Sequence, residues 1–217
     1  SDLHLGSVFS KEEEIYNLLS TTEFDELVLA GDIIDFIKIP SFTKHSAKLF
    51  DFAMQIKKPI IYIVGNHDIG FKEFVGQTIG KVRFVDQYDF EYASRKYRIQ
   101  HGDQYEKGII HWRFLIKIIS IFHDLLERRF KWNLAAWWVK LTKKKHELKR
   151  IWHIVKKWNE DADVFIMGHT HTPEAVIWVD KDNNIKTYVN TGDWVEHSTY
   201  VLIKNGEVRL KNYKDQS

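Results

Sequence analysis

Residues 164–174 read VFIMGHTHTPE, an apolar run that ends at a glycine and at two histidines one residue apart, His169 and His171. Side chains two residues apart in an extended chain point to the same side, so both imidazoles can face one point where the strand ends. A surface loop can also carry two such histidines without binding anything. The stretch predicts a buried strand, and it raises the question whether further ligands lie elsewhere in the chain.

Three other apolar, β-branched runs also end in polar clusters. They read ELVLAGD, PIIYIVGNHD and KYRIQHGD. Short apolar runs that end in turn residues are typical of buried strands. Between the first two runs, Leu49, Phe52, Ala53 and Ile56 recur at helical spacing, which predicts a helix over about 43–57. A strand, a helix and a further strand in this order indicate an α/β fold.

The carboxyl-terminal part contains KTYVNTGD and TYVLIKNGEVRL, which predict strands of a meander. The second run turns back at Asn205-Gly206, a dipeptide that favours a tight hairpin. We therefore expect mixed sheets. No linker or internal repeat divides the 217 residues, so residues 1–217 are expected to form a single domain. Because SDLHLG lacks the apolar strand expected before it, we also expect a strand segment that precedes Ser1.

The composition excludes several kinds of site. Apolar residues make up 44% of the chain and charged residues 29%, which is typical of a soluble globular protein. There is no cysteine, so disulfides, thiolate zinc sites and cysteine nucleophiles are excluded, and a reducing cytoplasm is compatible. The apolar run FLIKIISIF is broken by Lys117 and is shorter than the ~18 residues that a membrane-spanning helix needs.

Seven residues with metal-binding side chains lie at the predicted strand ends. They are Asp2, His4, Asp32, Asn66, His101, His169 and His171. The carboxyl ends of strands in α/β sheets are where ligands bind, so these side chains are expected to converge. Two pairs of ligands with i, i+2 spacing suit two metal ions, and a carboxylate can bridge them. A shell of oxygen and nitrogen without sulfur suits Mn²⁺, Fe²⁺ or Zn²⁺.

The motifs DLHLG, GDIID, GNHD, HGD and GHTH, in this order, resemble the signature of calcineurin-like metallophosphoesterases. The resemblance implies two facing mixed β-sheets flanked by helices, a four-layer αββα sandwich. We separately expect the segment between HGD and GHTH, at about 105–160, to form a helical cap insert. The resemblance implies two divalent metal ions and favours manganese, with zinc and iron as alternatives. By the same resemblance, one ion is held by Asp2, His4, Asp32 and His171, and the other by Asp32, Asn66, His101 and His169.

The resemblance also implies catalytic residues. His67 is expected to reach the phosphate or the leaving oxygen, and Asp68 to orient the His67 ring, although a turn cap is the alternative for Asp68. Two cations ~3.5 to 4 Å apart can activate a water molecule, so that hydroxide attacks phosphorus in line, and neutralise the phosphoryl oxygens. No protein nucleophile is then required.

The segment between HGD and GHTH has an unusual composition. Residues 107–157 contain 14 Lys and Arg against three acids, a charge of +11, so the remainder of this +2 chain carries −9. Six of the eight tryptophans lie at positions 112, 132, 137, 138, 152 and 158. An ordinary pair of helices packed on a sheet can have this composition. The alternative is a basic amphipathic cap that holds an amphiphilic substrate and rests against an anionic membrane surface.

This insert, DLHLG and NTGDWVE at residues 190–196 are similar to the UDP-2,3-diacylglucosamine diphosphatase group of lipid A synthesis. That similarity implies hydrolysis of a lipid-linked nucleotide sugar by a cytoplasmic enzyme that is peripheral at the inner membrane. The group carries arginine where this chain has His67, so another phosphodiester is also open as the substrate. A nuclease with a basic, aromatic surface and a non-catalytic binding scaffold are the alternatives. The sequence leaves the oligomeric state open.

Overall fold

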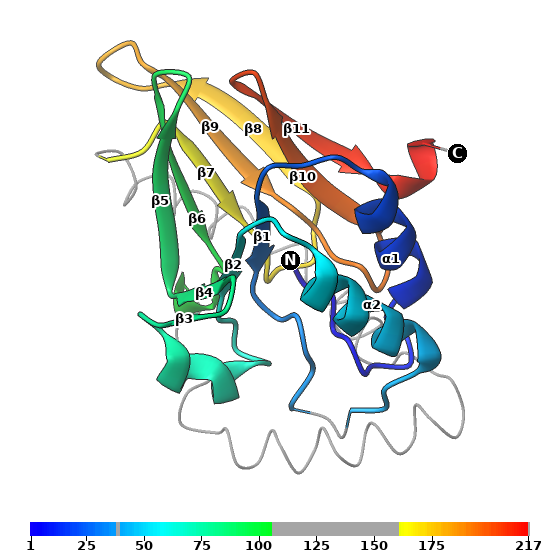
Figure 1. The fold of residues 1–217 in the computed structure, drawn as a ribbon. Coiled ribbons are helices and arrows are strands. Elements are labelled where there is room, and N and C mark those ends of the chain that lie inside the picture. Colours follow the sequence, from blue (N-terminus) through cyan, green and yellow to red (C-terminus); the bar gives the residue numbers. More distant parts are fainter. Residues whose placement is uncertain (38–39, 106–160, 217) are drawn as a thin grey trace.

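The computed structural model describes residues 1–37, 40–105 and 161–216 (Figure 1). The predicted helical cap insert at about 105–160 lies almost entirely outside the described residues. The elements are α1 (Glu12–Thr21), β1 (Leu27–Ala30), α2 (Lys44–Gln55), β2 (Ile60–Ile63), η1 (Ile69–Phe74), β3 (Thr78–Ile79), β4 (Val82–Val85), β5 (Gln87–Tyr92), β6 (Arg95–Gln100), η2 (Asp103–Tyr105), β7 (Val164–Met167), β8 (Glu174–Val179), β9 (Ile185–Asn190), β10 (Thr199–Lys204), β11 (Glu207–Asn212) and η4 (Tyr213–Gln216), where η marks a short, tightly wound helix.

Both large sheets are mixed, as predicted. The four-stranded sheet has the order β1-β2-β4-β3, in which only β3 runs antiparallel to its neighbour. The five-stranded sheet has the order β5-β6-β7-β9-β8, with β6, β7 and β9 parallel and both edge strands antiparallel. The strands β10 and β11 form a separate antiparallel pair.

The main core lies between the two large sheets. Ile61 and Ile63 of β2 form one buried cluster with Ile99 of β6 and with Val164 and Ile166 of β7. Successive side chains of a strand point to opposite faces, so the intervening residues of these strands lie on the faces that point away from this core. The prediction of two facing sheets is therefore confirmed.

The intervening residues pack against the outer layers. Tyr62 of β2 joins a cluster with Ile15 and Leu18 of α1 and with Leu49 of α2, so the two helices cover the outer face of the four-stranded sheet. Figure 1 shows these helices side by side. On the other sheet, Phe165 is buried on the face opposite to the main core. Strands that are buried on both faces explain the uninterrupted apolar runs in the sequence.

The predicted helix at about 43–57 is α2. It begins at a capping box, because the Thr43 hydroxyl accepts hydrogen bonds from the backbone N–H groups of His45 and Ser46, and the Ser46 hydroxyl accepts one from the Thr43 N–H. Among the described residues, no helix has the length and apolar character that crossing a bilayer requires.

The predicted hairpin at Asn205-Gly206 is confirmed, with φ values of 53° and 80° at these two residues. The prediction that the preceding strand belongs to the same meander is wrong. That strand, β9, pairs with β7 and β8 instead, because Tyr188 and Val189 bury side chains on both of its faces and therefore need a central position. The turns of the β5–β6, β8–β9 and β10–β11 hairpins lie together at the end of the molecule that is at the top of Figure 1.

Candidate metal centre

The amino-terminal segment brings two candidate ligands to the strand ends. The backbone N–H of Asp2 donates to the carbonyl of Gly31 at 2.9 Å, and that of His4 donates to the carbonyl of Asp32 at 3.0 Å. Leu5 then forms a parallel bridge with Ile34. Residues 2–5 thus run beside the loop that leaves β1, and Asp2 and His4 lie next to Asp32.

One group of possible metal ligands consists of Asp2, His4 and His171. Nε2 of His171 lies 3.3 Å from Oδ1 of Asp2 and 3.3 Å from Nε2 of His4. Oδ1 of Asp2 is buried and accepts no hydrogen bond from the described residues. Two imidazole nitrogens and a carboxylate oxygen that point at one another have the chemistry and spacing of a metal ligand set.

A second group consists of Asp32, His101 and His169. Nε2 of His101 lies 3.2 Å from Oδ2 of Asp32, 3.2 Å from Nδ1 of His169 and 3.2 Å from Oδ1 of Asn66. The amide oxygen of Asn66 therefore points into the same space. All seven residues singled out in the sequence thus converge on two adjacent groups, which fit metal ions that accept nitrogen and oxygen ligands.

The protonation of the histidines reflects this environment. Burial, followed by the charge of His67, lowers the pKa of His4 to about 4, so its imidazole is neutral and keeps a lone pair for a metal ion. Burial also acts to lower the pKa of His101, but the charge of Asp32 and a hydrogen bond to it outweigh burial and raise that pKa to about 10. The buried carboxylate of Asp32 therefore stabilises a positive charge at the place where a metal ion would lie.

The backbone at the candidate ligands is strained. Ten described residues other than glycine have a positive φ, and five of them are candidate ligands. Their φ values are 52° at Asp2, 47° at His4, 53° at Asp32, 67° at His169 and 57° at His171. This left-handed conformation costs roughly 1 kcal/mol or more per residue, and such strain clusters at functional sites. Asp and His adopt a positive φ more often than most other residues, but this preference is too weak to predict the conformation of a single position from the sequence.

The glycines of the motifs have a steric explanation. A Cβ atom at Gly31 would collide with the ring of His101, one at Gly65 with the carboxylate of Asp32, and one at Gly168 with that of Asp2. Each of these glycines lets a ligand from another loop approach its backbone closely.

His67 lies beside the two groups and is paired with an acid that sequence reasoning missed. Its Nδ1 lies 2.8 Å from Oδ1 of Asp35, and its side chain is 24% exposed. Burial acts to lower the pKa of His67, but the hydrogen bond to Asp35 and the charge of Asp32 raise it overall. Asp35 is the last residue of the GDIID motif. From the sequence, a role is assigned only to the first acid of this motif, Asp32.

Asp68, which we expected to orient the His67 ring, has other hydrogen-bond partners among the described residues. The carboxylate of Asp68 accepts hydrogen bonds from the N–H groups of Ile33 at 2.9 Å and Gly65 at 2.6 Å, and from the Tyr62 hydroxyl at 2.6 Å. These bonds tie together the loops that follow β1 and β2. They accord with the alternative interpretation of Asp68, a turn cap.

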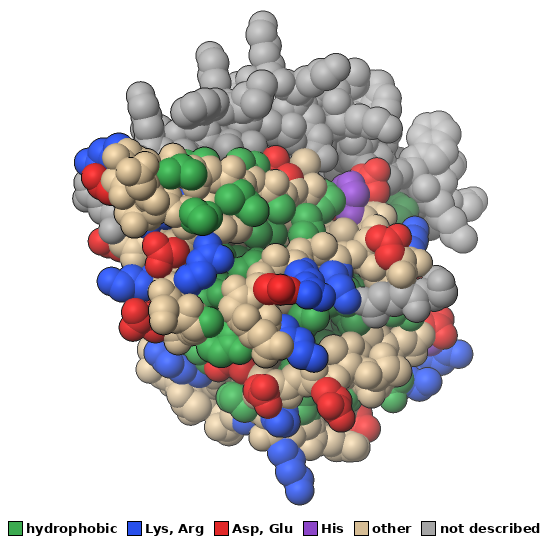
Figure 2. All heavy atoms as spheres, turned by 90° about the horizontal axis from the view of Figure 1, so that it is seen from above, with side chains coloured by type: hydrophobic (Ala, Val, Ile, Leu, Met, Phe, Trp, Pro, Cys, Tyr) green, Lys and Arg blue, Asp and Glu red, His purple; other side chains and the backbone are tan. Residues whose placement is uncertain are grey.

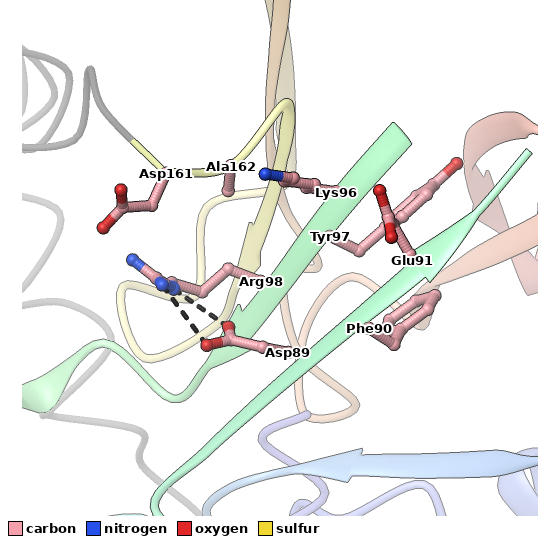
Figure 3. A pocket seen from close by; sticks show the side chains of 8 residues that line it. All are labelled: Asp89, Phe90, Glu91, Lys96, Tyr97, Arg98, Asp161 and Ala162. Carbon is pink, nitrogen blue, oxygen red and sulfur yellow. Dashed lines mark hydrogen bonds and ion pairs between the residues drawn. The ribbon is translucent and has the colours of Figure 1, made fainter. Parts of the chain in front are cut away.

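A cavity of about 260 Å³ lies elsewhere, between the β5–β6 hairpin and the start of β7 (Figure 3). Arg98 closes one side of it with a two-bond ion pair to Asp89, at 2.9 and 3.2 Å. Phe90 and Tyr97 stack at a centroid distance of 4.7 Å. None of the eight lining residues is a candidate ligand, so this cavity does not belong to the candidate metal centre.

Comparison with known proteins defines the class. The chain belongs to the calcineurin-like phosphoesterase family, whose sequence model matches residues 1–173. Solved structures with similar folds include an archaeal phosphodiesterase, which is 16% identical over 93% of this chain and 90% of that chain, with a TM-score of 0.46.

Two further similar structures come from a bacterium and a fungus. Vps29 of Chaetomium thermophilum is 11% identical over 97% of this chain and 93% of that chain, with a TM-score of 0.47. A conserved predicted phosphoesterase of Streptococcus pneumoniae TIGR4 is 12% identical over 97% and 94%, with a TM-score of 0.38. No curated protein matches the chain significantly.

Proposed function

We propose that this chain hydrolyses a phosphate ester or diphosphate bond with two divalent metal ions bound at the candidate metal centre. One ion would be held by Asp2, His4, Asp32 and His171, and the other by Asp32, Asn66, His101 and His169. The observation that carries the proposal is the convergence of the seven side chains, five of them on strained backbone, in a member of the calcineurin-like phosphoesterase family.

The chemistry is divided between the ions and the protein. Two bound divalent ions supply an activated water molecule and neutralise charge on the phosphoryl oxygens. His67 donates a hydrogen bond or a proton to a phosphoryl oxygen or to the leaving oxygen, because its Nδ1 is held by Asp35 and its ring is part exposed. The ligand set suits manganese, iron or zinc, because it contains nitrogen and oxygen but no sulfur, and the resemblance to metallophosphoesterases favours manganese.

We propose an amphiphilic substrate, a lipid-linked nucleotide sugar similar to UDP-2,3-diacylglucosamine. Support comes from the sequence of residues 107–157, where a charge of +11 accompanies long apolar runs and most of the tryptophans. Lysines of such a segment can meet anionic headgroups while indole rings lie at the boundary of a membrane. An enzyme that acts in the cytoplasm, at the surface of the inner membrane, accords with this composition.

The alternatives are a nuclease and a non-catalytic binding scaffold. A nuclease needs a basic surface that follows the phosphate backbone. Over the described part of the face in Figure 2, Lys and Arg side chains are interspersed with Asp and Glu, so this part offers no such surface. The basic segment 107–157 lies outside the described residues. A scaffold that has lost catalysis does not need to retain metal ligands, whereas the full set is present here.

The test compares three substrates with purified protein loaded with Mn²⁺: UDP-2,3-diacylglucosamine, a chromogenic phosphodiester and a single-stranded oligonucleotide. We expect hydrolysis of the first two. Asp32→Ala should abolish turnover and lower bound metal below two ions per chain, because a bridging carboxylate serves both ions. Cleavage of the oligonucleotide alone would favour the nuclease, and turnover of none would favour the scaffold.

A second experiment isolates the insert. Replacement of Trp137 and Trp138 by serine should raise KM for the diacylated substrate and leave turnover of the chromogenic phosphodiester nearly unchanged. Each buried methylene contributes ~0.8 kcal/mol, so losing roughly three or four weakens binding about 60- to 220-fold. Equal losses on both substrates would mean that these tryptophans support the fold instead.

A further inference from the structure

We propose that Asp193 is a positioning residue for His171, and that the segment 190–197 holds both ligand-bearing loops of the metal centre in place. The inference rests on the proposed function, since His171 is a ligand only if the site binds metal. The family model ends at residue 173, so this contribution comes from a part of the chain that the family match does not cover.

The first observation is the position of Asp193 behind the His171 ring. Asp193 is fully buried, and its Oδ2 lies 3.7 Å from Nδ1 of His171. The other ring nitrogen, Nε2, lies 3.3 Å from Oδ1 of Asp2. The ring therefore has a carboxylate at each end, one on the metal side and one behind it. Ligating histidines characteristically donate their second N–H to such a carboxylate, which fixes the tautomer and the ring orientation.

The second observation is that the two oxygens of Asp193 have different partners. Oδ1 accepts hydrogen bonds from the backbone N–H groups of Val195 at 2.7 Å, Glu196 at 2.5 Å and His197 at 3.3 Å. Oδ2 lies 2.6 Å from Nδ1 of His197, on the side that faces His171. Oδ1 thus shapes the turn, and Oδ2 is available to the two imidazoles.

The third observation is that neighbouring residues of the segment bind the loops that carry the ligands. The N–H of Trp194 donates to the carbonyl of Asp2 at 3.0 Å. The side-chain amide of Asn190 donates to the carbonyl of Gly168 at 3.0 Å and to the Thr170 hydroxyl at 2.9 Å. The segment therefore joins the loop before His4 to the loop that carries His169 and His171.

These contacts allow a structural role to be separated from a positioning role by substitution. Asp193→Asn keeps one carbonyl oxygen that can accept the three backbone bonds of the turn, but it places an amide donor where Oδ2 faced His171. Asp193→Ala removes both functions. Asp180→Asn is the matched control, because Oδ1 of Asp180 also accepts backbone bonds, from Asp182 at 2.8 Å and Asn184 at 2.9 Å, in the turn between β8 and β9, whose bonds involve no candidate ligand.

The experiment measures Mn²⁺ binding by titration calorimetry and the thermal unfolding midpoint of the metal-free protein for each variant. We expect Asp193→Asn to weaken binding at one of the two sites by ~10- to 100-fold, and to lower the metal-free Tm less than Asp193→Ala does, because it keeps the turn bonds and loses only the contact with His197. Asp193→Ala should weaken binding and also lower the metal-free Tm, and Asp180→Asn should leave Mn²⁺ binding unchanged.

Two results would overturn the inference: unchanged Mn²⁺ affinity in Asp193→Asn, or a lower metal-free Tm in Asp193→Asn with wild-type affinity, which would make the residue purely structural. The failure of the proposed function is distinguishable, because in that case the wild-type protein would hydrolyse none of the three substrates, whereas Mn²⁺ binding by the wild type and the variants still tests the role of Asp193.

Discussion

The carboxylate of Asp35 faces two histidines at once: its Oδ1 lies 2.8 Å from Nδ1 of His67, and its Oδ2 lies 3.8 Å from Nδ1 of His4. One buried acid therefore stands behind a candidate metal ligand and behind the candidate catalytic histidine. His4 and His67 also contact each other edge to face, with ring centroids 4.6 Å apart. Changes at Asp35 and His67 should consequently have separable effects on chemistry and on metal binding.

His67→Ala should retain two metal ions per chain and lose roughly 10² to 10⁴ in kcat, the range for a positioned acid or phosphoryl stabiliser. His67 lies beside both ligand groups without belonging to either, and its side chain is partly exposed, so it can contact a substrate. Metal content by elemental analysis and kcat on a chromogenic phosphodiester are the measurements. A loss of bound metal would instead make His67 a ligand.

Asp35→Asn should lower kcat by about tenfold and leave the metal-free stability little changed. Asparagine can still accept the hydrogen bond from His67, but a charged acceptor contributes ~1 to 1.5 kcal/mol more than a neutral one. That difference corresponds to about tenfold in rate. The same kcat in Asp35→Asn as in the wild type would show that His67 needs no charged partner.

Asp68→Asn should destabilise the fold without a comparable loss of kcat. The three donors that Asp68 accepts from require both carboxylate oxygens, and an amide group would point a donor at one of them. One buried donor left unpaired costs ~1 to 3 kcal/mol. Urea unfolding of the metal-free protein measures this cost. Asp51→Asn is the control and should leave stability nearly unchanged, because the only bond that the Asp51 side chain accepts from the described residues is an exposed one from Gln55.

The strand ends could be predicted because their causes are local. Runs such as IIYI and VFIM are buried on both faces, and this burial requires an uninterrupted apolar sequence. The edge strands β5 and β8 were missed for the opposite reason. Ile177 and Val179 of β8 are 70% and 61% exposed, so burial gives no simple alternation there. The β5–β6 hairpin turns at Ala93 and Ser94, which have φ values of 49° and 60° but are not typical turn residues for this conformation.

The candidate ligands could be predicted because each follows a strand, whereas their supporting residues could not. Asp35 meets His67 across two loops, and Asp193 meets His171 from the segment that follows β9. Such pairs depend on how the loops fold over one another. An acid near a ligand in sequence, such as Asp68, is therefore a poor guide to the acid that supports a histidine in space.

Gly65→Ala should lower the number of bound metal ions and the activity together. The added Cβ would collide with the carboxylate and the backbone N of Asp32, so the proposed bridging ligand would have to move. Gly70→Ala is the matched control, because a Cβ at Gly70 would meet no described atom within 4 Å, and it should behave as the wild type. Full metal content in Gly65→Ala would contradict the placement of Asp32 between the two ions.

Removal of metal should lower the stability of the protein and leave its secondary structure nearly unchanged. The candidate centre gathers the buried carboxylates of Asp2 and Asp32 and holds its ligands on strained backbone, while packing of the sheets does not depend on it. A ligand that binds only the folded state stabilises it by about 2.7 kcal/mol per site at 100 times its Kd. Mn²⁺ at that excess should therefore raise Tm clearly above that of protein treated with a chelator. The circular dichroism of the strands should stay nearly constant, and Asp32→Ala should show a much smaller rise in Tm. An equal rise in Asp32→Ala would mean that Mn²⁺ binds elsewhere on the chain.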